Sequence, residues 1–199
     1  MNIGIDIDDT ISDTYATLFP YAQKYTVEDL HKTGRINEEH KCATHKYVQA
    51  MHGWSEEEEQ PFWNKYYEKC LSETKIKLFA KETIDKLAKN NKIILITARW
   101  ENEEKSIQNL TKQWLKSNEV YYDDIILDAQ DKLKIAKEYN INLFIDDSFA
   151  NCLKIAEAGI DTLMMDTKYN NEYNDKKITR VYSWPHIYQE YEKILKEGN

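Results

Sequence analysis

Three aspartates within four positions stand near the start of this chain. Residues 3–10 read IGIDIDDT, so an apolar run leads directly into Asp6, Asp8 and Asp9. Acidic residues after a strand can simply form a turn or cap the next helix. Carboxylates that crowd together, however, repel one another unless a cation neutralises them. The pattern therefore favours a metal site at the end of a buried strand.

A second acidic pair supports this interpretation. Residues 143–148 read LFIDDS, so Asp146 and Asp147 again follow an apolar run. Ligands bind at the carboxyl ends of the strands in open α/β sheets. Two acid-tipped strands in one small sheet therefore predict a shared cation site of oxygen ligands. Mg²⁺ fits such a site best, because it takes few carboxylates and keeps water or phosphate oxygens as its other ligands.

Two further features have chemistry suited to phosphate. Residues 94–99 read ILITAR, which ends a strand with the Thr97 hydroxyl and the exposed backbone N–H groups around Ala98 and Arg99. Lys132 precedes the strand that carries Asp146, and its ammonium group could neutralise a phosphate. Each feature is weak alone: Thr97 could be an ordinary strand end, and Lys132 a solvated helix start.

Short apolar runs alternate with segments of helical period along most of the chain. The predicted strands are Asn2–Asp6, Lys92–Thr97, Asp124–Leu127, Ile141–Asp146 and Asp161–Met165, with a possible edge strand in Lys176–Trp184. The predicted helices are Phe79–Asn90, Glu101–Asn118, Asp131–Asn140, Phe149–Ala158 and His186–Lys196. Nearly continuous apolar strands are typical of a parallel sheet covered on both faces. The fold class is therefore α/β with right-handed crossovers.

One stretch, 14–78, breaks the alternation and predicts a helical insertion. It contains the helical segments His40–Met51 and Ser55–Cys70, and its aromatic content argues against a linker. We therefore expect a core built from 1–13 and 79–199 and a helical cap formed by 14–78. The aromatic residues of this region are Trp54, Phe62, Trp63, Tyr66 and Tyr67.

Composition narrows the classes of function. The chain has 199 residues with 27 Lys and Arg against 35 Asp and Glu, a net charge of −8, which disfavours binding of nucleic acid polymers. The first ten residues lack the apolar run of a signal peptide, and no run is long enough to span a membrane. We expect a cytoplasmic protein with reduced cysteines. Cys42 and His45 are spaced like a zinc pair, but no further ligand follows at a convincing spacing.

In this order, the motifs resemble those of the haloacid dehalogenase-like phosphohydrolase superfamily. The matching features are D-x-D-x-T at 6–10, the strand that ends in Thr97, Lys132, and the Asp146-Asp147 pair, and the resemblance covers about residues 1–165. It implies a Rossmann-like sheet whose first strand is central with the fourth beside it. It also implies an all-helical cap inserted after the first strand.

The resemblance assigns a role to each of these residues. Asp6 matches the nucleophile that becomes an aspartyl-phosphate, and Asp8 matches the general acid and base, whose backbone carbonyl also binds Mg²⁺. Thr97 and Lys132 match the groups that hold the transferring phosphoryl, and Ala98 and Arg99 are further candidates for binding phosphate or substrate. The metal candidates are Asp6, Asp8, Asp146 and Asp147. Whether Asp146 or Asp147 binds the metal directly is open. An acid at position 8 indicates phosphate ester hydrolysis rather than dehalogenation.

The substrate prediction rests on a narrower likeness. The IDIDDT start, the early helical cap and the LFIDDS segment are similar to the 5′(3′)-deoxyribonucleotidase family and its bacterial relatives. This implies a small phosphate ester, a (deoxy)nucleoside monophosphate, as the partner, with a homo-oligomer left open. The sequence departs from the family's pattern where Ala98 and Arg99 replace a small residue and a proline. Arg99 could contact substrate or pair with a nearby acid, and the cap aromatics could stack on a base or form a core.

Two alternatives remain at this point. One is a phosphatase of the same class acting on another small ester, such as a sugar phosphate. The other is a phosphate- or nucleotide-binding module without turnover. Because every expected catalytic residue type is present, the sequence favours an enzyme over the binding module.

Overall fold

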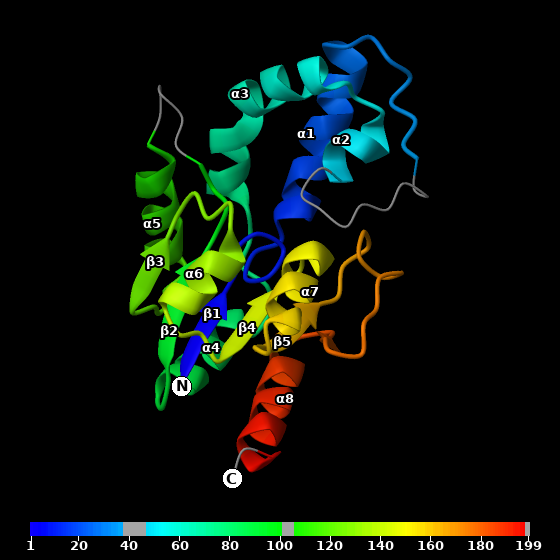
Figure 1. Ribbon diagram of the computed structural model, residues 1–199. Coiled ribbons are helices and arrows are strands. Elements are labelled where there is room, and N and C mark those ends of the chain that lie inside the picture. Colours follow the sequence, from blue (N-terminus) through cyan, green and yellow to red (C-terminus); the bar gives the residue numbers. More distant parts are fainter. Residues whose placement is uncertain (38–46, 101–105, 198–199) are drawn as a thin grey trace.

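Six strands form a single parallel sheet in the computed structural model, which describes residues 1–37, 47–100 and 106–197 (Figure 1). The strand order is β3-β2-β1-β4-β5-β6. The strands are β1 Asn2–Ile5, β2 Lys92–Ile96, β3 Asp124–Ile126, β4 Leu143–Asp146, β5 Asp161–Met165 and β6 Thr179–Val181. The α/β fold class and the central first strand are confirmed, and β6 is the predicted edge strand.

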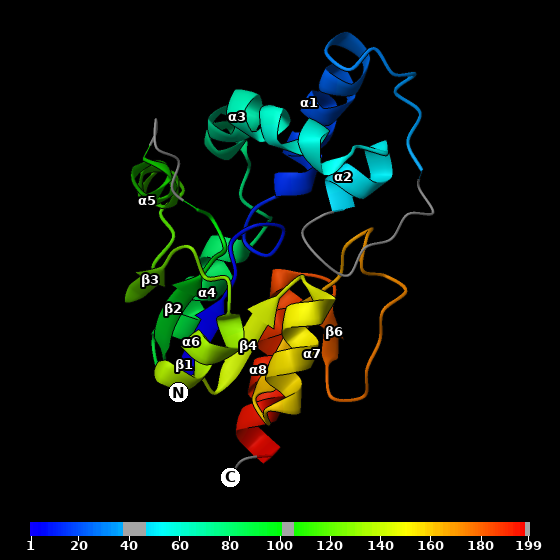
Figure 2. The same ribbon diagram turned by 45° about the horizontal axis from the view of Figure 1, so that its top comes forward.

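Helices cover both faces of the sheet (Figure 2). One face packs against α4 (Ala80–Ala88), α5 (Ile107–Ser117) and α8 (Trp184–Glu197) through a cluster that includes Ile5 and Leu95. The other face packs against α6 (Lys132–Glu138) and α7 (Phe149–Glu157) through a second cluster. Burial on both faces explains why the strands are apolar along nearly their whole length.

The register brings the ends of β1 and β4 to the same level. Ile5 pairs with Ile145 on one side and with Leu95 on the other. Gly4 permits this close approach, because a Cβ at that position would lie 2.9 Å from Cδ2 of Phe144. The residues that follow β1 and β4 therefore leave the sheet side by side.

Three helices lie beyond the carboxyl edge of the sheet (Figure 1). They are α1 (Thr14–Glu28), α2 (Tyr47–His52) and α3 (Glu56–Glu73). The predicted helix from Ser55 is confirmed, with the full capping box between Ser55 and Glu58. α1 contains Pro20 in its interior and corresponds to no predicted helix.

A hydrophobic cluster separate from those of the sheet joins these helices. Its members include Leu18, Tyr25, Trp54, Phe62 and Tyr66. This separate core supports a cap, although the exact division at residues 14 and 78 stays a prediction. Most of the predicted segment His40–Met51 lies outside the described residues.

Two smaller expectations concern membranes and thiols. Among the described residues, no helix is both long and apolar enough to cross a membrane. Cys70 and Cys152 are free and buried, as expected for reduced thiols. Cys42 and His45, the zinc-like pair, lie outside the part of the chain that the structure describes.

Candidate active site

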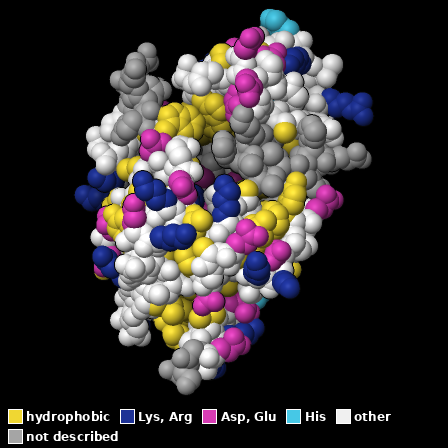
Figure 3. Space-filling model, in the orientation of Figure 1, with side chains coloured by type: hydrophobic (Ala, Val, Ile, Leu, Met, Phe, Trp, Pro, Cys, Tyr) yellow, Lys and Arg dark blue, Asp and Glu magenta, His cyan; other side chains and the backbone are white. Residues whose placement is uncertain are grey.

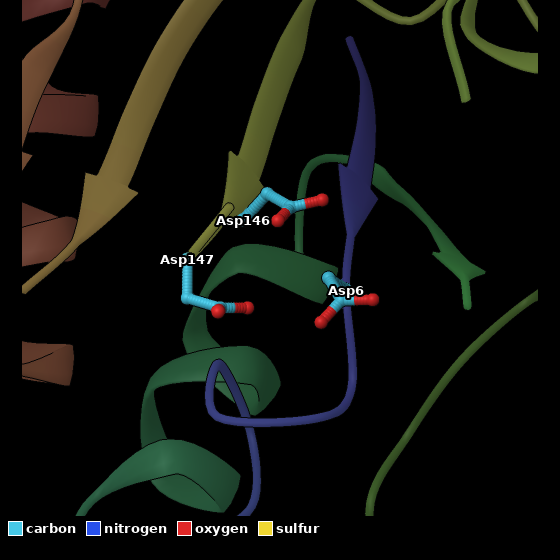
Figure 4. A group of neighbouring side chains, drawn as sticks. All are labelled: Asp6, Asp146 and Asp147. Atoms are coloured by element: carbon cyan, nitrogen blue, oxygen red, sulfur yellow. The ribbon is translucent and has the colours of Figure 1, made fainter. Parts of the chain in front are cut away.

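Three carboxylates meet where β1 and β4 end (Figure 4). Asp6 follows β1, and its backbone N–H donates to the Ile145 carbonyl at 2.9 Å, which extends the pairing of the two strands by one residue. Asp146 is the last residue of β4, and Asp147 follows it. One carboxylate oxygen from each of Asp6, Asp146 and Asp147 lies within 4.8 Å of the others, and all three residues are buried. The predicted meeting of the two acidic strand ends is thus present.

Lys132 lies between two of these carboxylates. Its Nζ donates to Oδ1 of Asp6 at 2.6 Å and to Oδ2 of Asp146 at 2.7 Å. The start of α6 positions Lys132, because the Asp131 side chain caps that helix through the Lys134 N–H. Burial alone would lower the pKa of Lys132, but the charges of Asp146 and Asp6 outweigh it and raise the pKa. The sequence-based alternative of a solvated helix start is therefore wrong.

The carboxylates carry more negative charge than Lys132 can balance. Three ionised carboxylates and one ammonium leave a charge of −3 + 1 = −2. Burial raises the pKa of Asp6 to about 7, partly opposed by Lys132. Burial and then the charges of Asp146, Asp6 and Asp9 raise the pKa of Asp147 well above its usual value. Such crowding is relieved by a divalent cation or by bound protons.

Asp8 is held in a different way from its neighbours. Arg99 donates to it in a fork, Nε to Oδ2 at 2.9 Å and Nη2 to Oδ1 at 2.7 Å, and Thr14 donates its hydroxyl at 2.7 Å. Burial acts to raise the pKa of Asp8, but the charge and hydrogen bonds of Arg99 outweigh it and lower the pKa. Of the two alternatives for Arg99, the structure shows the pairing with a nearby acid.

Thr97 and Ala98 lie in the same cavity as the carboxylates. The N–H of Thr97 donates to the Ile126 carbonyl at 3.0 Å, so strand pairing fixes its backbone. Its hydroxyl accepts a 3.3 Å hydrogen bond from the Arg99 N–H and is almost fully buried. The predicted phosphate-binding positions 97, 98, 99 and 132 therefore all line one cavity with the candidate metal ligands.

This cavity has a volume of about 520 Å³ and lies between the sheet edge and α3. Figure 3 shows a hollow on this face of the molecule, with hydrophobic side chains above it and Lys and Arg side chains below it. Its aromatic wall consists of Trp63, Tyr67 and Trp100. Tyr67 and Trp100 stack with ring centroids 4.4 Å apart, and Trp63 meets both rings edge-on.

The predicted cap aromatics divide into two groups. Trp63 and Tyr67 line the cavity, whereas Trp54, Phe62 and Tyr66 pack in the cap's own core. The sequence analysis left both roles open for all five. The division follows from helical geometry, since the residues lie on different faces of α3 or, for Trp54, just before it.

Sequence reasoning missed two residues of the site, Tyr169 and Asn170. The Tyr169 hydroxyl lies within hydrogen-bonding distance of Asp9 and Asp147, and Asn170 donates to the Asp147 carbonyl at 2.7 Å. Both follow β5, whose carboxyl end lies beside that of β4. This topology was the available signal, because polar residues after β5 must emerge next to Asp147.

Solved structures with a similar fold match this chain over nearly its whole length. The solved structure of a haloacid dehalogenase-like hydrolase family protein from Streptococcus pneumoniae superimposes with a TM-score of 0.65 at 14% identity, covering 96% of this chain and 97% of that one. No family model matches the sequence. The chain therefore has the fold of the haloacid dehalogenase-like hydrolases.

Relatives in sequence are closer. A nucleotidase from Clostridium acetobutylicum is 32% identical over 199 residues, which cover 100% of this chain and 97% of that protein. A candidate nucleotidase from Bacillus subtilis is 28% identical over 186 residues, which cover 92% of this chain and 90% of that protein. The chain belongs to this nucleotidase family, and it is a phosphoric monoester hydrolase.

Proposed function

We propose that the protein is a Mg²⁺-dependent 5′(3′)-nucleotidase that dephosphorylates (deoxy)nucleoside monophosphates through an aspartyl-phosphate on Asp6. The observation that carries this proposal is the position of Asp6 in a cavity with an aromatic wall. Asp6 accepts a hydrogen bond from Lys132, and one of its carboxylate oxygens lies within 4.8 Å of oxygens of Asp146 and Asp147. Membership of the nucleotidase family supports the substrate class.

The donor set fits Mg²⁺ as the cofactor. Asp6, Asp146 and Asp147 offer hard carboxylate oxygens, and no His or Cys joins the cluster among the described residues. With all three carboxylates ionised, Lys132 leaves a net charge of −2, and one divalent cation would neutralise it. When bound, Mg²⁺ would polarise the phosphoryl oxygens and offset their charge. We assign the three carboxylates and the Asp8 backbone carbonyl as its protein ligands.

In the first step, a carboxylate oxygen of Asp6 attacks phosphorus as the bond to the ester oxygen breaks. Lys132 and the hydroxyl of Thr97 bind the equatorial oxygens of the transferring group, with the N–H groups at Ala98 and Arg99 beside them. The leaving oxygen takes a proton from Asp8, which needs Asp8 in its neutral form. Because Arg99 favours the ionised form, substrate entry must loosen this pair before the first step.

In the second step, water hydrolyses the aspartyl-phosphate. Asp8 now accepts the proton of the attacking water, the Asp6–phosphorus bond breaks, and inorganic phosphate leaves with the Asp6 carboxylate restored. The Arg99 fork favours the ionised Asp8 that this step requires. Dividing the hydrolysis into two displacements eases a reaction for which a carboxylate is otherwise a weak nucleophile.

The aromatic wall supports a nucleoside rather than a small sugar as the leaving group. Trp100 is about one-third exposed and, with Trp63, presents ring surface to the cavity. Stacking of a base on an aromatic ring contributes roughly 1–3 kcal/mol, and most bases can use it. The cap's wall would therefore bind the base while the sheet edge binds the phosphate.

A panel of monophosphates, assayed with and without Mg²⁺, tests the proposal. We expect phosphate release from nucleoside monophosphates to need Mg²⁺ and to exceed that from ribose 5-phosphate at equal concentration. Trp100→Leu should raise KM for the nucleotide and leave KM for the sugar phosphate nearly unchanged. Equal rates on both substrate classes, with no effect of Trp100→Leu on either, would remove the nucleotidase assignment and leave a general phosphatase.

A further inference from the structure

The Tyr169 hydroxyl joins two acidic residues of the site. It lies 2.9 Å from Oδ2 of Asp9 and in short contact with Oδ2 of Asp147. Tyr169 is buried, in a segment that follows β5 and lies outside the motifs of the nucleotidase resemblance. A phenol has a single proton to donate, so with both carboxylates ionised the hydroxyl donates to one of them at a time.

A polar hub fixes the segment that carries Tyr169. Asn170 donates from Nδ2 to the carbonyls of Asp147 and Met165, at 2.7 and 2.8 Å. Arg180 in turn donates from Nη1 to Oδ1 of Asn170 at 2.8 Å and from Nη2 to the Asn170 carbonyl at 3.0 Å. The backbone beside Tyr169 is therefore tied both to the residue after β4 and to β6.

The ring of Tyr169 is fixed from the opposite side. It belongs to the hydrophobic cluster of the cap helices and meets Tyr15 edge-on, with centroids 6.1 Å apart. Tyr15 is in the first turn of α1, and its N–H donates to Oδ1 of Asp9 at 2.8 Å. Packing in the cluster needs only the ring, whereas the hydroxyl points at the carboxylates.

We propose that Tyr169 is a positioning residue that holds the Asp147 carboxylate in the orientation needed to bind a divalent cation, and that the Asn170–Arg180 hub holds Tyr169. This inference rests on the proposed function, since it takes Asp147 as a metal ligand. Asp147 also accepts from the Thr10 hydroxyl at 3.2 Å, through its other oxygen. With hydrogen bonds on both oxygens, rotation of the carboxylate is restricted before the cation binds. Groups that orient metal ligands in this way typically change metal affinity by about 10–100-fold.

Tyr169→Phe removes the hydroxyl and keeps the ring. We expect its Kd for Mn²⁺ and for Mg²⁺, measured by isothermal titration calorimetry without substrate, to rise by about 10–100-fold. In the assay, the Mg²⁺ concentration for half-maximal activity should rise by a similar factor, while kcat at saturating Mg²⁺ stays within a few-fold of wild type. If Tyr169 had a purely structural role, its replacement would not weaken metal affinity while leaving kcat at saturating Mg²⁺ nearly unchanged.

Tyr25→Phe is the matched control. Tyr25 belongs to the same cluster, and its hydroxyl donates to the Glu58 carbonyl at 2.8 Å, away from the carboxylates. This variant should lose thermal stability to a comparable extent and keep the wild-type Kd. Arg180→Lys, which loses the fork but keeps the charge, should give an intermediate Kd and provides a second test if Tyr169→Phe folds poorly.

The outcomes separate the two proposals. A wild-type Kd in both Tyr169→Phe and Arg180→Lys would overturn the role of Tyr169 and leave the proposed function standing. A wild-type protein that binds neither Mg²⁺ nor Mn²⁺ would overturn both. An equal loss of affinity in Tyr25→Phe would show that general destabilisation, not the hydroxyl, causes the effect, and would also overturn the inference.

Discussion

The site divides its four central aspartates into two electrostatic environments. Asp6, Asp146 and Asp147 lie together with one buried ammonium, which pairs with Asp6 and Asp146, so the cluster keeps an excess of negative charge. Asp8 is paired with the guanidinium of Arg99 in a two-point contact. The first environment suits a cation and a nucleophile, and the second favours the ionised Asp8 that acts as the base in the proposed second step. Acid and base roles commonly follow such differences in environment.

Asp6→Asn is expected to abolish turnover and to keep the fold. The amide has nearly the same shape as the carboxylate, but it cannot form the phosphoryl ester, and it removes one charge from a crowded cluster. Phosphate release and thermal unfolding measure the two effects. Asp13→Asn is the matched control, since Asp13 lies near the same loop but pairs with Lys77 outside the cavity. A turnover near the wild-type rate in Asp6→Asn would show that another group attacks phosphorus.

Asp8→Asn is expected to lower kcat by about 10²–10⁴, the usual contribution of general acid–base catalysis. The amide keeps a hydrogen-bonding partner for Arg99 but cannot give or accept the required protons. The loss in kcat/KM, which reports the first step, should be smaller for p-nitrophenyl phosphate than for a nucleoside monophosphate, because the acidic nitrophenol leaves without needing a proton. An equal loss with both leaving groups would remove Asp8 from the protonation step.

The elements position this chemistry through the packing of β1 against β4. Their pairing, Ile5 with Ile145, places Asp6 and Asp147 at one edge, and Gly4 allows Phe144 to pack against β1. Of the three helices above this edge, α1 and α3 contribute residues to the cavity wall. The proposed nucleophile, Asp6, thus lies directly after a buried strand, and the aromatic wall comes chiefly from α3 and the segment after β2.

Gly4→Ala tests this packing. The added methyl group would lie 2.9 Å from Cδ2 of Phe144 and 3.2 Å from Cδ1 of Ile96, so neighbouring side chains must move. Overpacking of this kind costs about 1–3 kcal/mol in the free energy of unfolding. Chemical denaturation should show a lower midpoint with an unchanged slope. An unchanged midpoint would mean that β1 and β4 approach less closely than described.

The strands and helices could be predicted from the sequence more fully than the contacts between side chains that are distant in the chain. Strand ends carrying Asp6, Thr97 and Asp146 are local features, and the parallel topology brings them together. The partner of Arg99 was not predictable, because several acids lay within reach of that long side chain. Tyr169 was missed because its hydroxyl meets Asp147 and Asp9, which lie 22 and 160 residues away in the chain.

At the scale of the whole molecule, the acidic cluster links folding to metal binding. In the absence of a cation, burial holds the pKa of Asp6 near 7, above its ordinary value of 3.8. A raised carboxyl pKa contributes stability below the ordinary value, and that stability is lost as the pH rises through 7. The metal-free protein should therefore lose stability from this group between about pH 4 and pH 7.

Mg²⁺ should reverse that loss, and more so at pH 8 than at pH 6. At pH 6 the cation must displace protons, whereas at pH 8 the carboxylates are already ionised. Saturation at 100 times Kd stabilises by about 2.7 kcal/mol, which raises Tm by roughly 5–10 °C for a chain of this size. Differential scanning fluorimetry at both pH values measures the shift. Asp147→Asn should weaken the shift, and a response that is larger at pH 6 would contradict this linkage.

The most direct test is to locate the phosphoryl group on the enzyme during turnover. A nucleoside monophosphate with a radiolabelled phosphate is mixed with the enzyme and Mg²⁺, the reaction is quenched in acid within milliseconds, and the peptides are mapped. We predict acid-stable, base-labile label on the peptide that contains Asp6 and none in Asp6→Asn. Full turnover with no labelled protein at any quench time, or label on a different residue, would contradict the account.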